Sequence, residues 1–509
     1  MAEYSTLAAV DLGTNSFHCQ IARVVGDQIY PLDALRESVR LGAGLGKDKR
    51  LDEISQERAL DCLMRFGERL RGLDRHTVRA VGTNTLRVAK NAAAFLKKAE
   101  TALGFPIEVV AGREEARLIY LGVSHSLPAS KEKRLVVDIG GGSTEFIIGA
   151  NYKPQKLDSL FMGCVSYSLR YFPDGKITKS AMKQAELAAR TELQPAVAGF
   201  ARGNWQHAVG SSGTARALAD ILQLNGFEDG RITPAGIDRL RTCMIKAGDM
   251  NRIELAGLRP DRVPVLPGGL AIMNAVLSEL AVDSMTVAGG SMRQGILYDM
   301  LGRFHHKDMR DVTVSQFMQR YHVDALQARR VGALAFILHG KLSEAAKSDA
   351  TDENAPLYIA WAAKLHEIGI SVAYSGYHKH SAYIINHADM PGFSRAEQTR
   401  LSQIVLAHRR SLKKVFDRIE DHIDLKTVLA LRLAALFYRG RADITQPPLQ
   451  ARLQDRKIRL ALDLDWLVRN PLTVTALRDE IREWDKLGFE LKIPGLDDVE
   501  TGAELALAN

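Results

Sequence analysis

Apolar residues in the first 300 positions alternate between two patterns. Short continuous runs, such as residues 7–10 and 135–137, have the length of buried strands and end at turns that contain glycine. Stretches with apolar residues three and four positions apart lie between these runs and predict helices. Strands that alternate with helices are typical of α/β domains. We therefore predict two α/β lobes, residues 1–124 and 125–303.

The pattern changes after the second lobe. Apolar residues recur at helical spacing, as in Leu334, Ile337 and Leu338, and strand-like runs are few. This spacing predicts an all-helical domain, residues 311–444. The preceding segment 302–310 is polar and basic, so we expect it to be an exposed linker.

The end of the chain mixes both patterns. Residues 458–464 and 489–493 have strand-like composition, and a helical pattern near 473–484 lies between them. We predict a small α+β domain, residues 445–509.

One segment of the first lobe recurs in the second. The run LAAVDLGTNS begins at Leu7, and the run LVVDIGGGSTE begins at Leu135. Each predicts a buried strand, an aspartate (Asp11 or Asp138), a glycine turn and a second strand. One such hairpin is common as a tight turn that its aspartate caps. Two copies about 127 residues apart favour duplication of a phosphate-binding unit.

The two turns have the composition of phosphate-binding loops. Gly13 and the glycines from Gly140 to Gly142 allow positive φ angles and a close approach of the backbone to a phosphate. Ser16 and Ser143 add hydroxyl donors. The aspartates stand beside these turns, where each can hold a metal ion or an ordered water.

Three further junctions join an apolar run to a helical pattern through glycine and a hydroxyl residue, at 81–85, 209–213 and 287–291. Each directs a helix N-terminus outward, and such ends bind anions through free N–H groups and the helix dipole. Any one of them is more often a capped turn, so their number carries the argument. Arg87 follows the first junction, where it either reaches a phosphate or remains a solvated charge.

Glu114 and Glu115 fall in the first turn of a helix that follows a strand. The helix dipole alone favours acidic residues there. Spacing by itself therefore favours a structural role for this pair over a catalytic one.

Composition and charge narrow the class of protein. With 46% hydrophobic and 25% charged residues, the 509-residue chain is neither disordered nor fibrous. The net charge of +8 favours a polyanionic partner, but no basic helix with interleaved aromatic residues indicates a specific nucleic-acid reader. No apolar run approaches ~18 residues, which predicts a cytoplasmic protein and leaves peripheral membrane contact open. The four cysteines have no paired spacing, so neither a zinc site nor a disulfide framework is expected.

Together these residues resemble the Ppx/GppA family of exopolyphosphatases and guanosine pentaphosphate phosphatases, within the actin, sugar-kinase and heat-shock ATPase superfamily. The resemblance rests on the motifs DLGTNSFH at 11–18, GTNTLR at 82–87, EEAR at 114–117, DIGGGSTE at 138–145, MGCVS at 162–166 and GSSGT at 210–214. Residues 361–369 and 380–384 are similar to the C-terminal region of long exopolyphosphatases. The resemblance implies two actin-like lobes followed by a helical HD-like domain.

The resemblance also implies roles for single residues. Glu115 would be the general base, and Asp138 and Glu145 would bind Mg²⁺ or another divalent cation, with Asp11 beside them. The residues implied to hold phosphate oxygens are Asn15, Ser16, Arg87, Gly141, Gly142, Ser143, Ser212 and Arg262.

The activity implied is that of an exopolyphosphatase, which removes terminal phosphates from inorganic polyphosphate processively by direct attack of water. Phosphoryl transfer needs neutralised charge and a water held in line, which a metal, backbone donors and one carboxylate supply. Hydrolysis of guanosine pentaphosphate is the main alternative, because both substrates end in a phosphoanhydride. A kinase and a non-catalytic polyanion-binding protein of the same superfamily are weaker alternatives. We also expect a homodimer.

The helical domain resembles the His-Asp metal phosphohydrolases. However, the chain has His366-Glu367 where those enzymes carry the His-Asp pair. This difference favours binding over metal catalysis, and we expect Lys379, Arg409 and Arg410 to form a basic track for long substrates.

Overall fold

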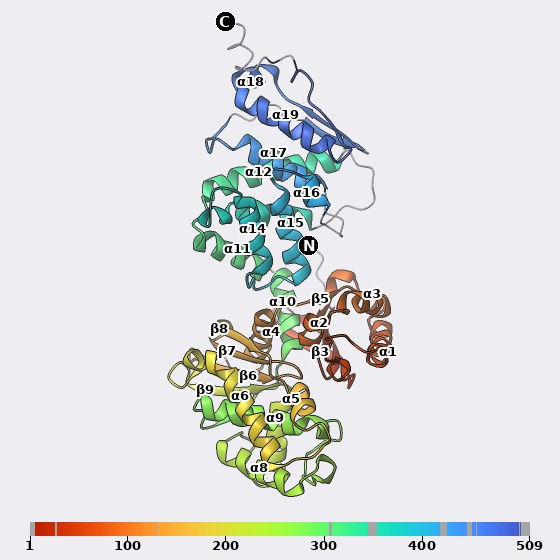
Figure 1. Cartoon of the computed structure of the whole chain (residues 1–509), viewed down its shortest axis with the longest axis vertical. Coiled ribbons are helices and arrows are strands. Elements are labelled where there is room, and N and C mark those ends of the chain that lie inside the picture. The colour runs from red at the N-terminus through yellow and green to blue at the C-terminus, as the bar shows by residue number, and fades with distance from the viewer. Residues whose placement is uncertain are drawn as a thin grey trace. The chain divides into compact units, whose positions relative to one another are not determined.

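The computed structural model describes residues 6–25, 28–128, 130–304, 308–344, 354–417, 425–444, 450–454, 456–497 and 499. Internal contacts divide the chain into two compact units (Figure 1). Unit 1 comprises Met1–Met309 and Pro391–Arg395, and unit 2 comprises Arg310–Met390 and Ala396–Asn509.

Unit 1 contains two five-stranded sheets. The strands of the first are β1 (Thr6–Leu12), β2 (Phe17–Val25), β3 (Gln28–Glu37), β4 (Val78–Gly82) and β5 (Ile107–Val109). The strands of the second are β6 (Arg134–Ile139), β7 (Thr144–Ala150), β8 (Lys153–Leu160), β9 (His207–Ser211) and β10 (Met285–Val287).

The two sheets have the same topology. The first has the order β3-β2-β1-β4-β5, and the second, read from its other edge, has the order β8-β7-β6-β9-β10. In each sheet the first three strands in sequence form antiparallel hairpins, and the last two add in parallel. The repeat predicted from the two DxG segments is therefore confirmed, and it extends to whole lobes.

Ten α-helices cover these sheets and join their strands. They are α1 (Glu53–Leu70), α2 (Asn84–Val88), α3 (Ala92–Leu103), α4 (Gly112–His125), α5 (Cys164–Tyr171), α6 (Lys179–Phe200), α7 (Ser212–Leu224), α8 (Pro234–Ala247), α9 (Leu266–Glu279) and α10 (Met292–Phe304). Polar caps fix several starts: the Asp52 carboxylate accepts from the Ser55 N–H at 2.6 Å, and Thr178 and Thr233 cap α6 and α8 in the same way.

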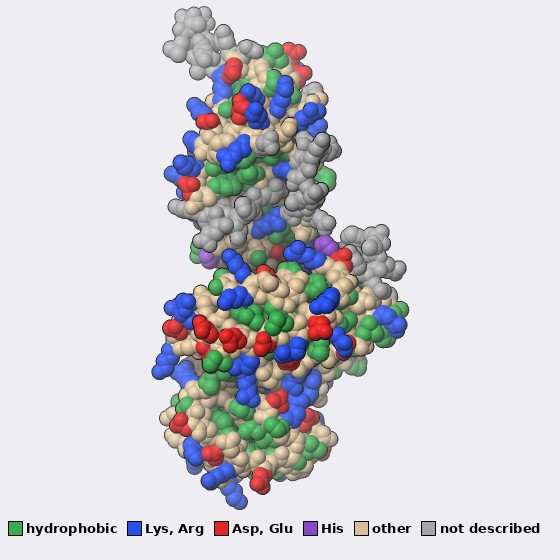
Figure 2. All heavy atoms as spheres, turned by 90° about the vertical axis from the view of Figure 1, so that its right-hand side faces the viewer, with side chains coloured by type: hydrophobic (Ala, Val, Ile, Leu, Met, Phe, Trp, Pro, Cys, Tyr) green, Lys and Arg blue, Asp and Glu red, His purple; other side chains and the backbone are tan. Residues whose placement is uncertain are grey.

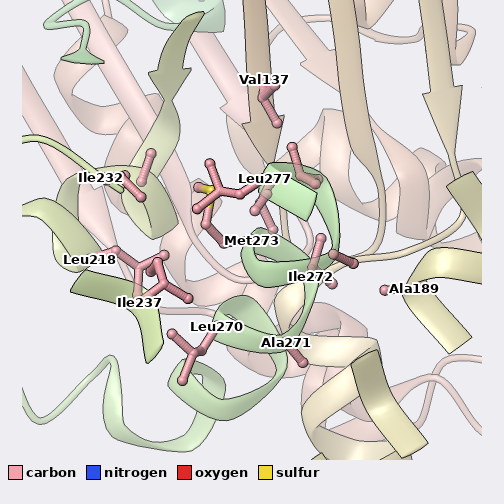
Figure 3. Close-up of a cluster of buried hydrophobic side chains, with 14 of the residues drawn as sticks. Val137, Ala189, Leu218, Ile232, Ile237, Leu270, Ala271, Ile272, Met273 and Leu277 are labelled. Carbon is pink, nitrogen blue, oxygen red and sulfur yellow. The ribbon is translucent and has the colours of Figure 1, made fainter. Parts of the chain in front are cut away.

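The core of the second lobe is built around α9, which is apolar on all sides (Figure 3). Leu270 and Met273 of this helix are fully buried and lie near Leu218 of α7 and Ile237 of α8. Val137 of β6 belongs to the same cluster. A helix without a polar face must be covered all round, which explains why α9 forms the centre of this lobe.

Glycines bring α4 and α10 into close contact. A Cβ atom on Gly295 would lie 1.7 Å from the Leu118 carbonyl oxygen, and one on Gly122 would lie 2.0 Å from the Ser291 carbonyl oxygen. Only glycine permits this backbone approach. The contact fixes α4, whose first turn carries Glu114 and Glu115.

Unit 2 contains a helical region and a small sheet. Its helical region comprises α11 (Met309–Arg320), α12 (Ala325–Glu344), α13 (Ala355–Leu365), α14 (Tyr377–His387), α15 (Arg395–Ala407), α16 (Lys413–Phe416) and α17 (Leu425–Phe437). The sheet region comprises β11 (Gln450–Gln454), β12 (Lys457–Ala461), α18 (Leu464–Arg469), α19 (Pro471–Asp485) and β13 (Glu490–Lys492). The predicted fold class, two α/β lobes followed by helices and a small α+β part, is confirmed.

Details of the sequence prediction need correction. The strand β11 and helix α18 were not expected, because alternating burial over five residues and a six-residue helix give little periodic signal. Ile337, expected on an apolar face, is 41% exposed.

The segment 302–310 is not a simple exposed linker. Its first residues complete α10, where the half-buried Arg303 donates to Asp299 at 3.1 Å, and α11 begins at Met309. Residues 305–307 of the expected linker lie outside the described residues.

Cys19, Cys62 and Cys164 are buried, Cys243 is exposed, and all four are free thiols. Among the described residues, no helix combines the length and the apolar character needed to cross a membrane.

Candidate active site

The turns of the two repeated hairpins face each other. A Cβ atom on Gly141 would lie 2.8 Å from Cβ of Thr14, and one on Gly142 would lie 2.5 Å from Oδ1 of Asn84. Neither these glycines nor Gly13 and Gly140 has φ in the left-handed region, so the turns do not use the positive φ that glycine allows. Their role is close approach: the turns meet where any side chain would keep them apart.

All three predicted junctions connect a strand to a helix, as β4 to α2, β9 to α7 and β10 to α10. The second junction is strained, because Ser212 has φ of 71° without being glycine. Its hydroxyl donates to the Ile139 carbonyl at 3.1 Å, and the Thr214 hydroxyl donates to the same oxygen at 2.8 Å. These bonds fix the α7 N-terminus beside the second hairpin turn.

The hairpin turns and junctions enclose a cleft of about 370 Å³ in unit 1. The predicted site residues that line it are Asp11, Asn15, Ser16, Glu115, Asp138, Gly141, Gly142, Ser143, Ser212 and Arg262. Two predicted residues, Arg87 and Glu145, stand behind the lining. Predicted residues from five separate segments of the chain thus converge on one cleft.

Glu115 is 8% exposed and reaches the cleft from the first turn of α4. Its carboxylate accepts from Nη1 of Arg87 at 2.7 Å, and the same guanidinium donates to the Val110 carbonyl at 2.9 Å. Arg87 therefore orients the carboxylate in this structure. A charge-assisted pair of this kind restricts the position of a base before substrate binds.

Four carboxylates share this region. Asp138 and Glu145 are cross-strand neighbours on β6 and β7, and the Ser159 hydroxyl donates to Glu145 at 2.8 Å. Burial, with the negative charge of Glu115, raises the pKa of Asp138 to about 6. Burial and the charges of Glu115 and Asp138 raise the pKa of Asp11 to about 7 and that of Glu145 well above its ordinary value.

This crowding fits a divalent cation, which would relieve the repulsion among the carboxylates. Among the described residues, however, no group of three or more His, Cys, Asp or Glu side chains is arranged to enclose a metal ion. Mg²⁺ does not require such an enclosure, since it usually keeps several waters and binds one or two carboxylates together with substrate phosphates. The carboxylate pair therefore fits Mg²⁺ as a partner shared with the substrate.

Of the arginines that line the cleft, the sequence prediction named only Arg262. Arg36, Arg216, Arg259 and Arg293 line the cleft together with Arg262. His18 lies among these arginines. Burial, together with the charges of Arg293, Arg36, Arg262 and Arg216, lowers the pKa of His18 to about 2. Arg216 and Arg293 follow two of the predicted junctions directly, a signal that could have found them, whereas Arg36 lies on β3 with no local motif.

Gly213 leaves room for the Arg262 guanidinium at its position in the cleft. A Cβ atom on Gly213 would lie 2.0 Å from Nη2 of Arg262. The Nε atom of Arg262 is buried without a hydrogen-bond partner. Such a group favours an anionic ligand that accepts from it.

Glu114, the neighbour of Glu115, has a different environment. It is 2% exposed and pairs in bidentate fashion with Arg117 at 2.8 Å. Arg117 also donates to Asp299 at 2.5 Å, and the Gly392 N–H donates to Glu114 at 2.8 Å. The pair at the start of α4 is thus divided: Glu114 belongs to a buried ion network, and Glu115 faces the cleft.

Two family models match the chain. A model of the Ppx/GppA phosphatase family matches residues 20–304, and a model of Ppx/GppA phosphatase, domain III, matches residues 309–481. The chain belongs to the Ppx/GppA phosphatase family. It is a hydrolase of phosphoanhydride bonds with actin-like lobes, and this removes the non-catalytic and kinase alternatives.

Curated and solved relatives extend the comparison. The chain is 36% identical over 488 residues to the guanosine-5'-triphosphate,3'-diphosphate pyrophosphatase of two Vibrio cholerae serotype O1 strains, covering 96% of this chain and 97% of each relative. It is also similar to the crystal structure of an exopolyphosphatase from Cytophaga hutchinsonii. That match has 26% identity and a TM-score of 0.53, and covers 58% of this chain and 98% of the other.

The residues predicted as a basic track lie in unit 2 of this Ppx/GppA phosphatase. Arg409 and Arg410 follow α15 and line a second cavity, whereas Lys379 is exposed on α14 outside its lining. His366 is buried, and its neighbour Glu367 accepts from Arg441 at 2.6 Å. An arginine thus holds the carboxylate at the position where the His-Asp enzymes have their metal-binding aspartate.

Proposed function

We propose that the cleft of unit 1 removes the 5'-terminal phosphate of guanosine pentaphosphate. The observation that supports hydrolysis is Glu115, a buried carboxylate that faces two phosphate-binding turns. The relative named for guanosine-5'-triphosphate,3'-diphosphate matches this chain over nearly its whole length, which supports this substrate.

In the proposed reaction, Glu115 accepts a proton from the attacking water. Arg87 keeps the Glu115 carboxylate in place, and this carboxylate is the only catalytic base required. The water attacks the terminal phosphorus directly, so no phosphoenzyme forms.

Asp138 and Glu145 would hold Mg²⁺, with Asp11 on the other side of the cleft. The cation would supply neutralisation of charge on the phosphate oxygens. Asp138 lies at the end of β6, in register with Ser211 of the neighbouring strand β9.

Backbone and side-chain donors would bind the phosphates. Asn15, Ser16, Ser143 and Ser212 line the cleft together with the glycine turn, and their donors would bind the terminal phosphate. The arginines of the cleft wall would hold further phosphates along the substrate.

Inorganic polyphosphate is a second candidate, and one observation favours it. No Phe, Tyr or Trp side chain is among the residues that line the cleft, so the described wall offers no platform for stacking a base. The basic track of Lys379, Arg409 and Arg410 and the homodimer stay predictions that belong with this candidate.

A side-by-side assay separates the two. Purified full-length protein would be given guanosine pentaphosphate or long-chain polyphosphate with Mg²⁺, and kcat/KM would be measured for each. We expect the nucleotide to be preferred at least tenfold, about 1.4 kcal/mol of transition-state discrimination. A preference for polyphosphate would overturn the proposed substrate. If Glu115→Gln keeps both activities, the proposed base is wrong.

A further inference from the structure

The second cavity lies wholly within unit 2 and has a volume of about 570 Å³. Its walls come from α12, α14, α17 and α19, from the segment between α13 and α14, and from the residues that follow α15 and α17. Cavities of about 300–1,000 Å³ are the usual size for small-molecule sites.

Charge in this cavity is unbalanced. Seven Arg or Lys side chains line it against four carboxylates. Each carboxylate is already paired, as Arg432–Glu480, Arg441–Glu367, Arg482–Asp479 and Lys486–Glu483. Within the described residues, Arg409, Arg410 and Arg439 have no carboxylate partner. Three guanidinium groups therefore remain available to an anion.

A buried arginine fixes the backbone that carries Arg409 and Arg410. Arg432 is 4% exposed, pairs with Glu480, and donates to the Ala407 carbonyl at 2.6 Å and to the Arg410 carbonyl at 3.1 Å. This pairing holds Arg410 at φ of 67°, in the left-handed region. A bulky residue held there is strained, and such strain occurs mainly at functional sites.

Two buried polar atoms in the cavity lack hydrogen-bond partners. They are the Nε2 atom of His408 and the Oε1 atom of Gln327. His408 donates from Nδ1 to the Val405 carbonyl, so its Nε2 is an acceptor when the ring is neutral. Water or a ligand group that entered would supply the missing donors.

An aromatic ring stands beside the free cations. Tyr374 is 75% exposed and lines the cavity, with its ring centroid 6.2 Å from that of Tyr377. Arg409 covers Tyr377 at 4.6 Å, but Tyr374 carries no such cation. An exposed ring next to phosphate-binding groups is a platform on which a base stacks.

We propose that this cavity binds a nucleoside diphosphate, with the phosphates on Arg410 and Arg439 and the base stacked on Tyr374. The site is separate from the hydrolytic cleft in unit 1. The inference does not rest on which substrate the cleft hydrolyses.

Photoaffinity labelling tests the site directly. Full-length protein would be irradiated with 8-azido-GDP or 8-azido-ADP, and the labelled peptides would be identified by mass spectrometry. We expect labelling of the peptide that contains Tyr374 and Tyr377, with protection by unlabelled nucleoside diphosphate. Labelling of cleft peptides alone, or of none, would overturn the proposal.

Exposed residues provide the variants, so that folding is not at risk. Arg439→Gln and Tyr374→Ala should each weaken protection at this peptide about tenfold, since a charge-assisted bond and a stacked base are lost. Arg329→Gln and Tyr383→Ala are matched controls in unit 2, because both residues are exposed and lie outside this cavity. If Tyr374→Ala has no effect and tripolyphosphate protects as well as GDP, the cavity binds bare phosphate chains and the nucleotide assignment is wrong.

Discussion

The cleft of unit 1 and the cavity of unit 2 are both lined by arginines and carboxylates, but they combine them differently. In the cleft, Asp11, Asp138 and Glu145 repel one another, and burial raises their pKa values. In the cavity, every lining carboxylate is neutralised by an arginine or lysine. Unpaired carboxylates attract a cation and protons, which hydrolysis requires. Where every carboxylate is paired, the remaining guanidinium groups can bind an anion.

The net charge does not reveal this difference. On the face drawn in Figure 2, Lys and Arg side chains are scattered among Asp and Glu and form no single basic patch. The positive charges that matter are local, because Arg36, Arg216, Arg259, Arg262 and Arg293 all line the cleft. Four predictions test the contrast, from the largest expected effect to the smallest.

Glu115→Gln should lower kcat by about 10²–10⁴, the usual cost of losing a general base, while substrate affinity changes little. Steady-state and single-turnover kinetics would measure it. Asp220→Asn is the matched control, because Asp220 also lines the cleft but is exposed at its mouth. Equal losses in both variants would show a general field effect and remove Glu115 from its role.

Glu114→Gln is not a suitable control, although its neighbouring position suggests it. Glu114 is bound to Arg117 and to the Gly392 N–H, so the change disturbs a buried network.

Asp138→Asn should raise the Mg²⁺ concentration required for half-maximal activity by about 10–100-fold, because a charged ligand becomes neutral. The measurement is a Mg²⁺ titration of initial rate. If the titration coincides with that of the wild type, the cation lies elsewhere in the cleft.

Because of Asp138, the free energy of unfolding should also fall as pH rises. Its pKa is about 6 in the folded protein against an ordinary 3.8, so the folded state binds more protons than the unfolded state between these values. Folding stability from this group is therefore greatest below about pH 4 and declines as pH rises through about 6.

Without metal, Asp138→Asn should become more stable than the wild type by roughly 1–3 kcal/mol at pH 8, and the difference should shrink toward pH 4. Urea denaturation at both pH values in the presence of a chelator would measure it. Added Mg²⁺ should restore the wild type at pH 8. A difference that is constant across pH would contradict the buried, charge-crowded site.

The smallest effect concerns the basic track. Arg409→Gln should weaken binding of long polyphosphate a few-fold at low salt and less at high salt, since single exposed contacts are screened. Deleting all residues after α10 is a poorer test, because Pro391–Arg395 packs within unit 1. If the affinity is unchanged at low salt, Arg409 is not part of a track.

The sequence by itself determined the lobes, their duplication and most of the cleft. Continuous apolar runs and period-3.6 patterns reflect local geometry, and DxG turns and strand-glycine-helix junctions are local motifs. They located Asp11, Asp138, Ser143 and Ser212 without knowledge of the fold.

Only the tertiary structure decided the partners of those residues. The separation of Glu114 from Glu115 depends on Asp299 and Gly392, which are distant in sequence. Arg36 enters the cleft from a strand with no motif, and Arg262 enters because Gly213 leaves it room. Contacts across the fold decide which carboxylate is paired and which is left for a cation, because charge neutralisation acts through space rather than along the chain.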